Sequence, residues 1–257
     1  MNSIPVIECA TFGDKKLIEG TLTKLQRHIR TYGWMSTSAV IAKNVRFSLL
    51  HAREKQFDSK FRVDTAGSIA LEDLAIDSDN KSRGVYYEPT PPHVFHHILS
   101  KLDIDHREFE FVDFGCGKGR VVLLAARYPF RKITGIEFAP ELAEVARRNL
   151  ATFTDKAQQC TKLDVVCLDA TQYEIPDTKA VLYFFNPFDA IVMEAIARNL
   201  EASFQRNRAE KFLIYYNPQS EAVFEKLPFL QKVVSAKRIV DFASPRFSGY
   251  TIYRTID

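Results

Sequence analysis

From about residue 91 onward, short apolar segments alternate with amphipathic ones, and this alternation constrains the fold more than any other feature of the sequence. The apolar segments are rich in Val, Ile, Phe and Tyr, which is typical of buried strands. They occupy residues 109–114, 131–138, 163–168, 181–185 and 211–217. Segments with helical periodicity lie between and after them, at residues 91–102, 118–129, 140–153, 189–206 and 218–227. Strands that alternate with helices at this spacing predict a mostly parallel sheet with helices on both faces.

Two further strands are expected near the C-terminal end, over residues 231–242 and 249–255. No helix can fit between them, because they are joined only by the turn-forming stretch SPRFSG. Such a connection makes an antiparallel pair. The sequence therefore predicts an α/β fold with a mostly parallel sheet that closes on an antiparallel pairing.

The first third of the chain has a different pattern. Apolar residues recur every three to four positions over residues 14–33, which predicts a helix with an acidic N-cap and a glycine stop. A second helix is expected over residues 37–54, and residues 57–85 are expected to form a long loop with little regular structure. We therefore predict a helical N-terminal extension that covers the substrate, residues 1–83, ahead of an α/β domain, residues 84–257.

Composition is ordinary for a globular protein, with 46% hydrophobic and 26% charged residues. The longest apolar runs, at residues 121–126 and 180–185, are too short to span a bilayer, and the N-terminus lacks the features of a secretory signal. We expect a cytoplasmic protein without a membrane span. The four cysteines lack CxxC or zinc-site spacing, and His93 and His97 lack a third ligand, so free thiols and no metal site are expected.

The sequence FVDFGCGKGR, residues 111–120, begins in the first predicted strand and continues into a glycine-rich loop, which raises the question of a ligand. Three glycines, Gly115, Gly117 and Gly119, allow a backbone to approach a ligand closely, and the next helix points its N-terminal amides at the same place. A dinucleotide fingerprint needs a small residue at the position that Arg120 occupies. The spacing therefore disfavours a nicotinamide-dependent oxidoreductase and leaves other adenosine-containing cofactors.

Polar residues stand at or near the ends of four successive strands: Asp113, Glu137, Asp169 and Asn186. In an open parallel sheet, ligands bind beyond the carboxyl ends of the strands. A carboxylate at Glu137 can accept both hydroxyls of a ribose, and one at Asp169 can accept an adenine amino hydrogen. The alternative for each acid is a helix cap. Four such residues beside a glycine loop favour a ligand site.

The motifs DFGCGKG, GIEFAPEL, CLDAT and FFNPF, in this order, resemble those of class I S-adenosylmethionine-dependent methyltransferases over roughly residues 84–257. The resemblance implies a Rossmann-like, seven-stranded sheet in the order 3-2-1-4-5-7-6. It also implies S-adenosyl-L-methionine as cofactor, with the glycine loop at its methionine part, Glu137 at its ribose and Asp169 at its adenine. The cofactor-binding residues that it implies are Thr90, Asp113, Gly115, Cys116, Gly117, Gly119, Glu137, Phe138, Asp169, Ala170 and Asn186.

The segment GVYYEPT, about 20 residues before the glycine strand, is similar to a segment of lysine methyltransferases that lack the SET fold. There a tyrosine and a hydroxyl residue close over the cofactor, which implies this role for Tyr87 and Thr90. The alternative is a turn that packs aromatic rings on the sheet and starts a helix.

The motif Asn186-Pro187-Phe188 resembles the acceptor motif of amino-group methyltransferases, although it has one proline where that motif has two. The resemblance implies that Asn186, Phe188 and Tyr87 act in catalysis. The alternative is a simple strand exit. We expect methylation of nitrogen on a protein lysine or another amine. A non-catalytic cofactor-binding regulatory module and a small-molecule O-methyltransferase remain open, as do a nucleic-acid acceptor and the oligomeric state.

Overall fold

The computed structural model describes residues 52–69, 87–237 and 249–256, with a few positions between residues 29 and 48. The chain divides into two compact units, residues 1–53 with 241–245 and residues 54–240 with 246–257, and the second unit holds the sheet. Most of the helix predicted over residues 14–33 and most of the turn SPRFSG lie outside the described residues, and residues 29–31 of that helix are helical. A division of the chain at residue 83 stays a prediction.

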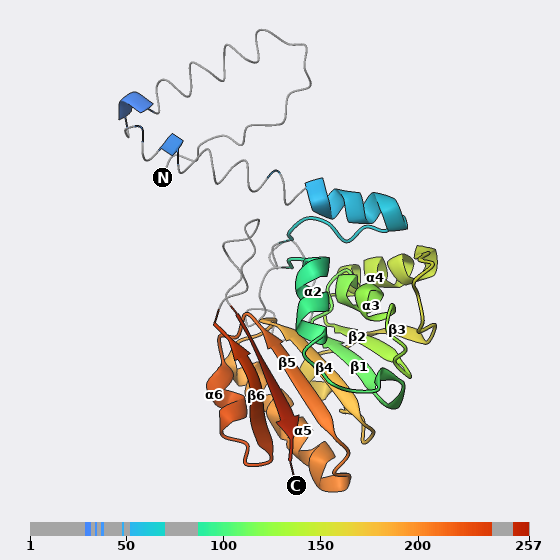
Figure 1. Ribbon diagram of the computed structural model, residues 1–257, viewed down its shortest axis with the longest axis vertical. Coiled ribbons are helices and arrows are strands. Elements are labelled where there is room, and N and C mark those ends of the chain that lie inside the picture. Colours follow the sequence, from blue (N-terminus) through green and yellow to red (C-terminus); the bar gives the residue numbers. More distant parts are fainter. Residues whose placement is uncertain are drawn as a thin grey trace. The chain divides into compact units, whose positions relative to one another are not determined.

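Seven strands form one sheet in the order β3-β2-β1-β4-β5-β7-β6, which confirms the predicted fold (Figure 1). Neighbours among β1 to β5 pair in parallel, while β7 pairs antiparallel with both β5 and β6. The strands are β1 (Glu110–Phe114), β2 (Ile133–Glu137), β3 (Leu163–Cys167), β4 (Ala180–Phe185), β5 (Lys211–Tyr216), β6 (Leu230–Ala236) and β7 (Tyr250–Thr255). Each predicted strand segment therefore contains a strand or overlaps one.

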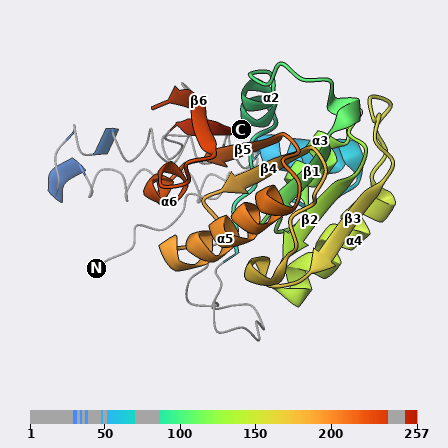
Figure 2. The ribbon, with the colours of Figure 1, turned by 90° about the horizontal axis from the view of Figure 1, so that it is seen from below.

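Helices cover both faces of the sheet and divide the core into two large apolar clusters. The helices are α2 (Pro92–Leu99), α3 (Arg120–Ala125), α4 (Pro140–Thr152), α5 (Ala190–Arg206) and α6 (Glu221–Glu225). Side chains of α2, α3 and α4 belong to one cluster and those of α5 and α6 to the other, on the opposite side of the sheet (Figure 2). Alternate residues of β4 serve the two clusters, Tyr183 the first and Phe184 the second, as the pleat of a doubly covered strand requires.

Residues 52–61 are helical, so the prediction that a loop begins at residue 57 is wrong. Phe57 and Phe61 lie one helical turn apart and are buried in the first cluster, where the Phe61 ring lies 5.5 Å from that of Phe153. A helix places both phenylalanine side chains on one face, so both can bury apolar surface against the first cluster. A loop would not hold them in this arrangement.

The segment that follows this helix, residues 62–67, crosses close to the glycine loop, and we call it the strap. Arg120, the first residue of α3, is 2% exposed and lies with its guanidinium 4.1 Å from the Phe57 ring centre. Its Nη2 lies 3.2 Å from Asp58 Oδ1, and its Nε donates to Thr65 Oγ1. The Thr65 hydroxyl in turn donates to Asp58 Oδ1 at 2.6 Å. The buried cation therefore has both a counter-ion and a hydrogen-bonded neighbour.

Lys118 and Asn149 join the strap to the glycine loop and to α4. Lys118 Nζ lies 2.9 Å from Asp64 Oδ1 and 3.1 Å from the carbonyl oxygen of Ala66. The Asn149 amide nitrogen donates to the carbonyl oxygens of Asp64 and Lys118, both at 2.8 Å. Three segments far apart in sequence are thus held together by hydrogen bonds beside the loop.

Replacing Asp58 by Ala is expected to lower the free energy of unfolding by about 3 kcal/mol, because it leaves the Arg120 cation buried without its counter-ion. Urea denaturation of wild type and Asp58→Ala measures the change. Asp103→Ala, at an exposed acid, is the control and is expected to stay within about 0.5 kcal/mol of wild type. Equal stability of the two variants would show that the ion pair contributes nothing net.

Candidate functional site

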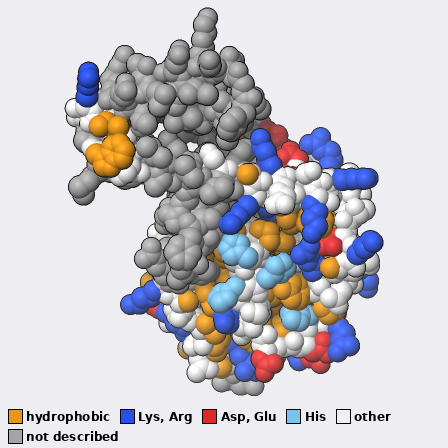
Figure 3. All heavy atoms as spheres, turned by 45° about the horizontal axis from the view of Figure 1, so that its top comes forward, with side chains coloured by type: hydrophobic (Ala, Val, Ile, Leu, Met, Phe, Trp, Pro, Cys, Tyr) orange, Lys and Arg blue, Asp and Glu red, His pale blue; other side chains and the backbone are white. Residues whose placement is uncertain are grey.

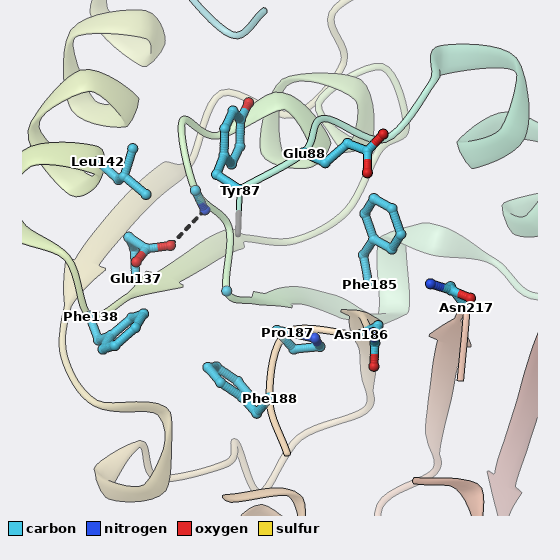
Figure 4. Close-up of a pocket in the computed structure, with 12 residues that line it drawn as sticks. Tyr87, Glu88, Glu137, Phe138, Leu142, Phe185, Asn186, Pro187, Phe188 and Asn217 are labelled. Carbon is cyan, nitrogen blue, oxygen red and sulfur yellow. Dashed lines mark hydrogen bonds between the residues drawn. The ribbon is translucent and has the colours of Figure 1, made fainter. Parts of the chain in front are cut away.

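A pocket with a cavity volume of about 130 Å³ opens at the carboxyl ends of the parallel strands (Figure 4). Its walls come from the loops after β1, β2, β4 and β5 and from the segment before α2. The lining residues are Tyr87, Glu88, Gly115, Gly117, Glu137, Phe138, Leu142, Phe185, Asn186, Pro187, Phe188 and Asn217. The glycine loop and the motif FFNPF, 70 positions apart in sequence, therefore face the same cavity.

Close approaches in the loop explain why it needs glycine. Gly115 and Gly117 have φ angles of 75° and 54°, in the left-handed region that side chains disfavour. A Cβ on Gly117 would lie 2.1 Å from the Tyr87 ring, and one on Gly115 would lie 2.7 Å from Pro187 Cβ. Tyr87 and Pro187 can approach the loop this closely only because Gly117 and Gly115 have no side chains.

Glu137, the last residue of β2, points its carboxylate at the glycine loop. It is 3% exposed and accepts hydrogen bonds from the amides of Gly117, at 2.8 Å, and Ala139, at 2.9 Å (Figure 4). Burial raises the pKa of this carboxyl to about 7, against the lowering effect of the backbone amides. Glu137 therefore has two roles. It accepts a cap-like hydrogen bond from the Ala139 amide, just before α4, and it forms part of the pocket wall.

Tyr87 covers the glycine loop and is held by the strap. Its hydroxyl donates to the carbonyl oxygen of Thr65 at 2.6 Å, and its backbone pairs with that of Ile69. Burial raises the pKa of the hydroxyl well above its usual range, so the ring stays neutral at physiological pH. The structure places the Tyr87 ring against Gly117 of the loop, and its role in closing over the cofactor stays a prediction.

Asn186, Pro187 and Phe188 form the pocket wall next to Gly115. The Asn186 backbone is left-handed, with φ 40°, and the Phe188 ring is edge-on to that of Phe138 at 6.4 Å between centres. The pocket is thus bounded by the predicted ribose acid on one side and the predicted acceptor asparagine on the other.

Other predicted site residues lie near this pocket without lining it. The hydroxyls of Thr90 and Tyr183 are buried and lie 3.2 Å apart. Asp113 is 3% exposed, and burial together with the negative charge of Glu137 raises its pKa well above the usual value. Cys116 packs against Gly135 of β2, and Gly119 caps α3 with its Cα facing α4.

Asp169 caps a short 3-10 helix, Ala170–Gln172, by accepting hydrogen bonds from the amide of Thr171 at 2.9 Å and its hydroxyl at 2.7 Å. The amide of Leu168 donates to the carbonyl oxygen of Glu137 at 3.0 Å, so the end of β3 lies beside the end of β2. The buried Ala170 belongs to the apolar cluster of α5. The adenine-binding role of Asp169 and Ala170 stays a prediction.

Four lining residues were missed by the sequence analysis: Glu88, Leu142, Phe185 and Asn217. Asn217 could have been found, because YYNP at the end of β5 repeats the pattern of FFNP at the end of β4. Leu142 lies on α4 with no distinguishing sequence pattern.

The histidines of α2 and of the short helix His106–Glu108 gather on one face of the described surface (Figure 3). His96 Nδ1 lies 2.9 Å from the Tyr128 hydroxyl, and the His106 ring packs on the same tyrosine. Within the described residues, no group of three or more His, Cys, Asp or Glu side chains is arranged to hold a metal ion. No helix in that part of the chain has the length and hydropathy of a bilayer-spanning segment.

Residues 111–209 match a family model described as a methyltransferase domain. A curated relative, the malonyl-[acyl-carrier protein] O-methyltransferase of Acetivibrio thermocellus, is 29% identical over 102 residues, which make up 38% of this chain and 35% of that protein. The chain thus matches about a third of that relative's length.

Solved structures with similar folds include the glycopeptide N-methyltransferase MtfA, with a TM-score of 0.50 and 7% identity over 66% of this chain and 92% of that one. Another is an RNA methyltransferase from Salinibacter ruber in complex with S-adenosyl-L-homocysteine, with a TM-score of 0.41 and 20% identity over 65% and 92%.

The matched residues begin in β1 and end just after α5, so they include the glycine loop, Glu137, Asp169 and Asn186. The strand order of the sheet is the one that the class I resemblance implies. The chain therefore carries a match to a methyltransferase domain over residues 111–209, within a sheet of the Rossmann-like type.

Proposed function

We propose that this protein transfers a methyl group from S-adenosylmethionine to the nitrogen of an amine acceptor. One observation carries the proposal: a single pocket runs from Gly117 and Glu137 to Asn186. The first two residues suit an adenosyl cofactor, and the third suits an N–H donor. A donor and an acceptor bound at these two places would meet within one cavity.

The residues present fit the cofactor. The loop glycines leave a cradle that a Cβ would fill. A carboxylate can accept about four hydrogen bonds, and the bonds from Gly117 and Ala139 take one site on each oxygen of Glu137. Capacity remains for the two ribose hydroxyls. Asp169 and Ala170 are proposed to hold the adenine, because β3 ends beside Glu137.

S-adenosylmethionine supplies a methyl group on a sulfonium, so the leaving group needs no further activation. The protein must chiefly hold the acceptor in line and exclude water. The Asn186 amide oxygen can accept a hydrogen bond from an amine N–H and so orient its lone pair. Phe188 and Phe138 close the wall on that side with apolar rings. This arrangement suits an amine and does not require a strong base.

Transfer to oxygen is the second candidate, because the relative from Acetivibrio thermocellus is named as an O-methyltransferase that acts on a malonyl group. The charge of this pocket argues against an acceptor with a carboxylate. Among the described lining residues, Glu88 and Glu137 are acidic and none is Lys, Arg or His. Like charges would raise the cost of binding an anion.

Wild-type protein is expected to bind S-adenosylhomocysteine in calorimetry, and Gly117→Ala to bind it at least about tenfold more weakly. The added Cβ would displace the Tyr87 ring and strain a left-handed backbone. Gly67→Ala is the matched control, because Gly67 has φ 84° but its Cβ would meet nothing within 4 Å. Absence of binding by wild type would refute the proposed function.

The affinity for S-adenosylhomocysteine is expected to fall by about tenfold between pH 8 and pH 6. Glu137 has a pKa of about 7, so lowering the pH protonates it and removes acceptor sites that the ribose hydroxyls need. Glu137→Gln should bind weakly at both pH values, with little difference between them. A wild-type affinity that is the same at pH 6 and pH 8 would contradict the ribose role.

Transfer itself is tested with methyl-labelled S-adenosylmethionine in a cell lysate, followed by mass spectrometry of the species that gains label. Asn186→Gly keeps the left-handed backbone, since glycine adopts φ 40° freely, but removes the amide. We expect this variant to retain S-adenosylhomocysteine binding and to lose about tenfold to hundredfold in the rate of labelling. An unchanged rate would exclude Asn186 from acceptor positioning.

A further inference from the structure

A group of basic side chains lies where the helix of residues 52–61 meets the C-terminal end of α4. We call it the basic surface, and its four members are exposed: Lys60, Arg62, Arg148 and Lys156. They come from three segments, which are the end of that helix, the last turns of α4 and the loop that follows α4. Figure 3 shows Lys and Arg side chains gathered at this end of the described part of the molecule.

One hydroxyl brings two of these residues together. Thr152 Oγ1 lies 3.0 Å from the carbonyl oxygen of Arg62 and 3.0 Å from that of Arg148. The two arginines are 86 positions apart in sequence, yet their backbones are bridged by a single side chain. Their guanidinium groups therefore start from neighbouring points on the surface.

The other two members are placed by the Phe61 ring. The Lys60 ammonium lies 5.0 Å from the centre of this ring, and the Arg127 guanidinium lies 5.1 Å from it. Arg127 in turn donates to Asp155 Oδ2 at 2.6 Å, so the loop that carries Lys156 is held beside the same ring. Packing and hydrogen bonds thus fix all three segments of the basic surface.

None of the four cations forms an ion pair with another described residue. The acids close to them are already paired. Asp155 is bound by Arg127, and Glu144, one helical turn before Arg148, lies 3.9 Å from Arg147 instead. The surface therefore carries positive charge that the described part of the chain does not neutralise.

Arg62 also has an unusual backbone for its residue type. Its φ is 57°, in the left-handed region, and the next amide, that of Val63, donates to the carbonyl oxygen of Asp58 at 3.1 Å. A glycine is the usual residue at such a helix end, and a larger one is strained there. The turn itself does not call for an arginine, so the feature favours a use for the cation.

The chemistry of the basic surface suits a chain of phosphates. Arginine binds phosphate through two parallel N–H bonds, and a nucleic acid presents phosphates at regular intervals along its length. A protein partner or a lipid surface would ordinarily need apolar anchors. Among the described residues, the large exposed apolar side chains are Trp34, Ile191, Val233 and Ile256, and none belongs to this surface.

We propose that the basic surface binds the phosphate backbone of a nucleic acid without regard to base sequence. The inference goes beyond the proposed function and does not depend on it, because it needs no methyl donor. The strap begins at Arg62 and contacts Tyr87 through Thr65, so one short segment joins the basic surface to a residue of the pocket.

The test is fluorescence anisotropy of full-length protein with a fluorescein-labelled single-stranded RNA of about 20 nucleotides. Wild type is expected to bind with a Kd of about 10⁻⁴ to 10⁻⁶ M at 150 mM salt, and four phosphate contacts give a slope of about −3 for log K against log salt. The double variant Arg62→Asn/Arg148→Gln should bind about tenfold more weakly, with a slope less steep by about 1.4. Asparagine tolerates the left-handed backbone at position 62.

Arg198→Gln/Lys226→Gln is the matched control. It removes the same charge from two exposed residues of α5 and the end of α6, which cover the other face of the sheet, and it should keep the wild-type affinity and slope. Lys60→Gln/Lys156→Gln leaves the strained backbone of Arg62 untouched and should weaken binding as much as the first double variant. This second variant keeps the test decisive if the first is unstable.

Three results would overturn the inference. The first is no binding of the RNA by wild type at 50 mM salt. The second is an equal loss of affinity in the control and in the basic-surface variants, which would assign binding to net charge alone. The third is equally tight binding of a labelled poly-glutamate of the same length, which would assign the surface to an acidic protein. Each of these results would leave the proposed function intact.

Discussion

The hydrogen bond from the Gly117 amide to the Glu137 carboxylate is the contact on which the site depends. It joins the loop after β1 to the end of β2, two strands that are already paired in the sheet. A buried carboxylate is costly unless it is hydrogen-bonded, so the amide and the acid fix one another. The pKa of about 7 shows that this compensation is incomplete. A bound sugar that donates two further hydrogen bonds would complete it.

The glycine loop also depends on residues far from it in sequence. In the sequence alone, Arg120 disfavours a dinucleotide fingerprint, which needs a small residue there. The structure shows what an arginine contributes at this position. Its cation is buried against Phe57 and Asp58, which lie on the helix of residues 52–61. Tyr87 is anchored to the strap through Thr65. The shape of the pocket therefore depends on a segment that precedes the sheet.

The strands could be predicted because buried strands appear in the sequence as continuous apolar runs, whereas their order was implied by the resemblance to class I methyltransferases. Glu137 and Asn186 stand at the ends of such runs and line the pocket, and their binding roles stay predictions. The C-terminal end of the helix of residues 52–61 was missed. Its residues are held by tertiary contacts that no local pattern indicates, such as the ion pair of Asp58 with Arg120, 62 residues away. Glu88 and Leu142 could not be assigned, because tertiary contacts alone bring them to the pocket. For Asp169, the sequence could predict the local capping hydrogen bonds, because they involve residues next to it. Whether Asp169 binds adenine stays a prediction.

Asn186 and Asn217, which follow β4 and β5, show how the sheet stores backbone strain at the pocket wall. A non-glycine residue with positive φ costs about 1–3 kcal/mol and persists only where its surroundings over-determine it. Here the register of β4 with β5 and the stacking of Phe185 on Tyr216 supply that constraint. Relief of strain at either asparagine would require the pair of strands to shift together. The positions of the two asparagines in the pocket wall are therefore set by the pairing of β4 with β5.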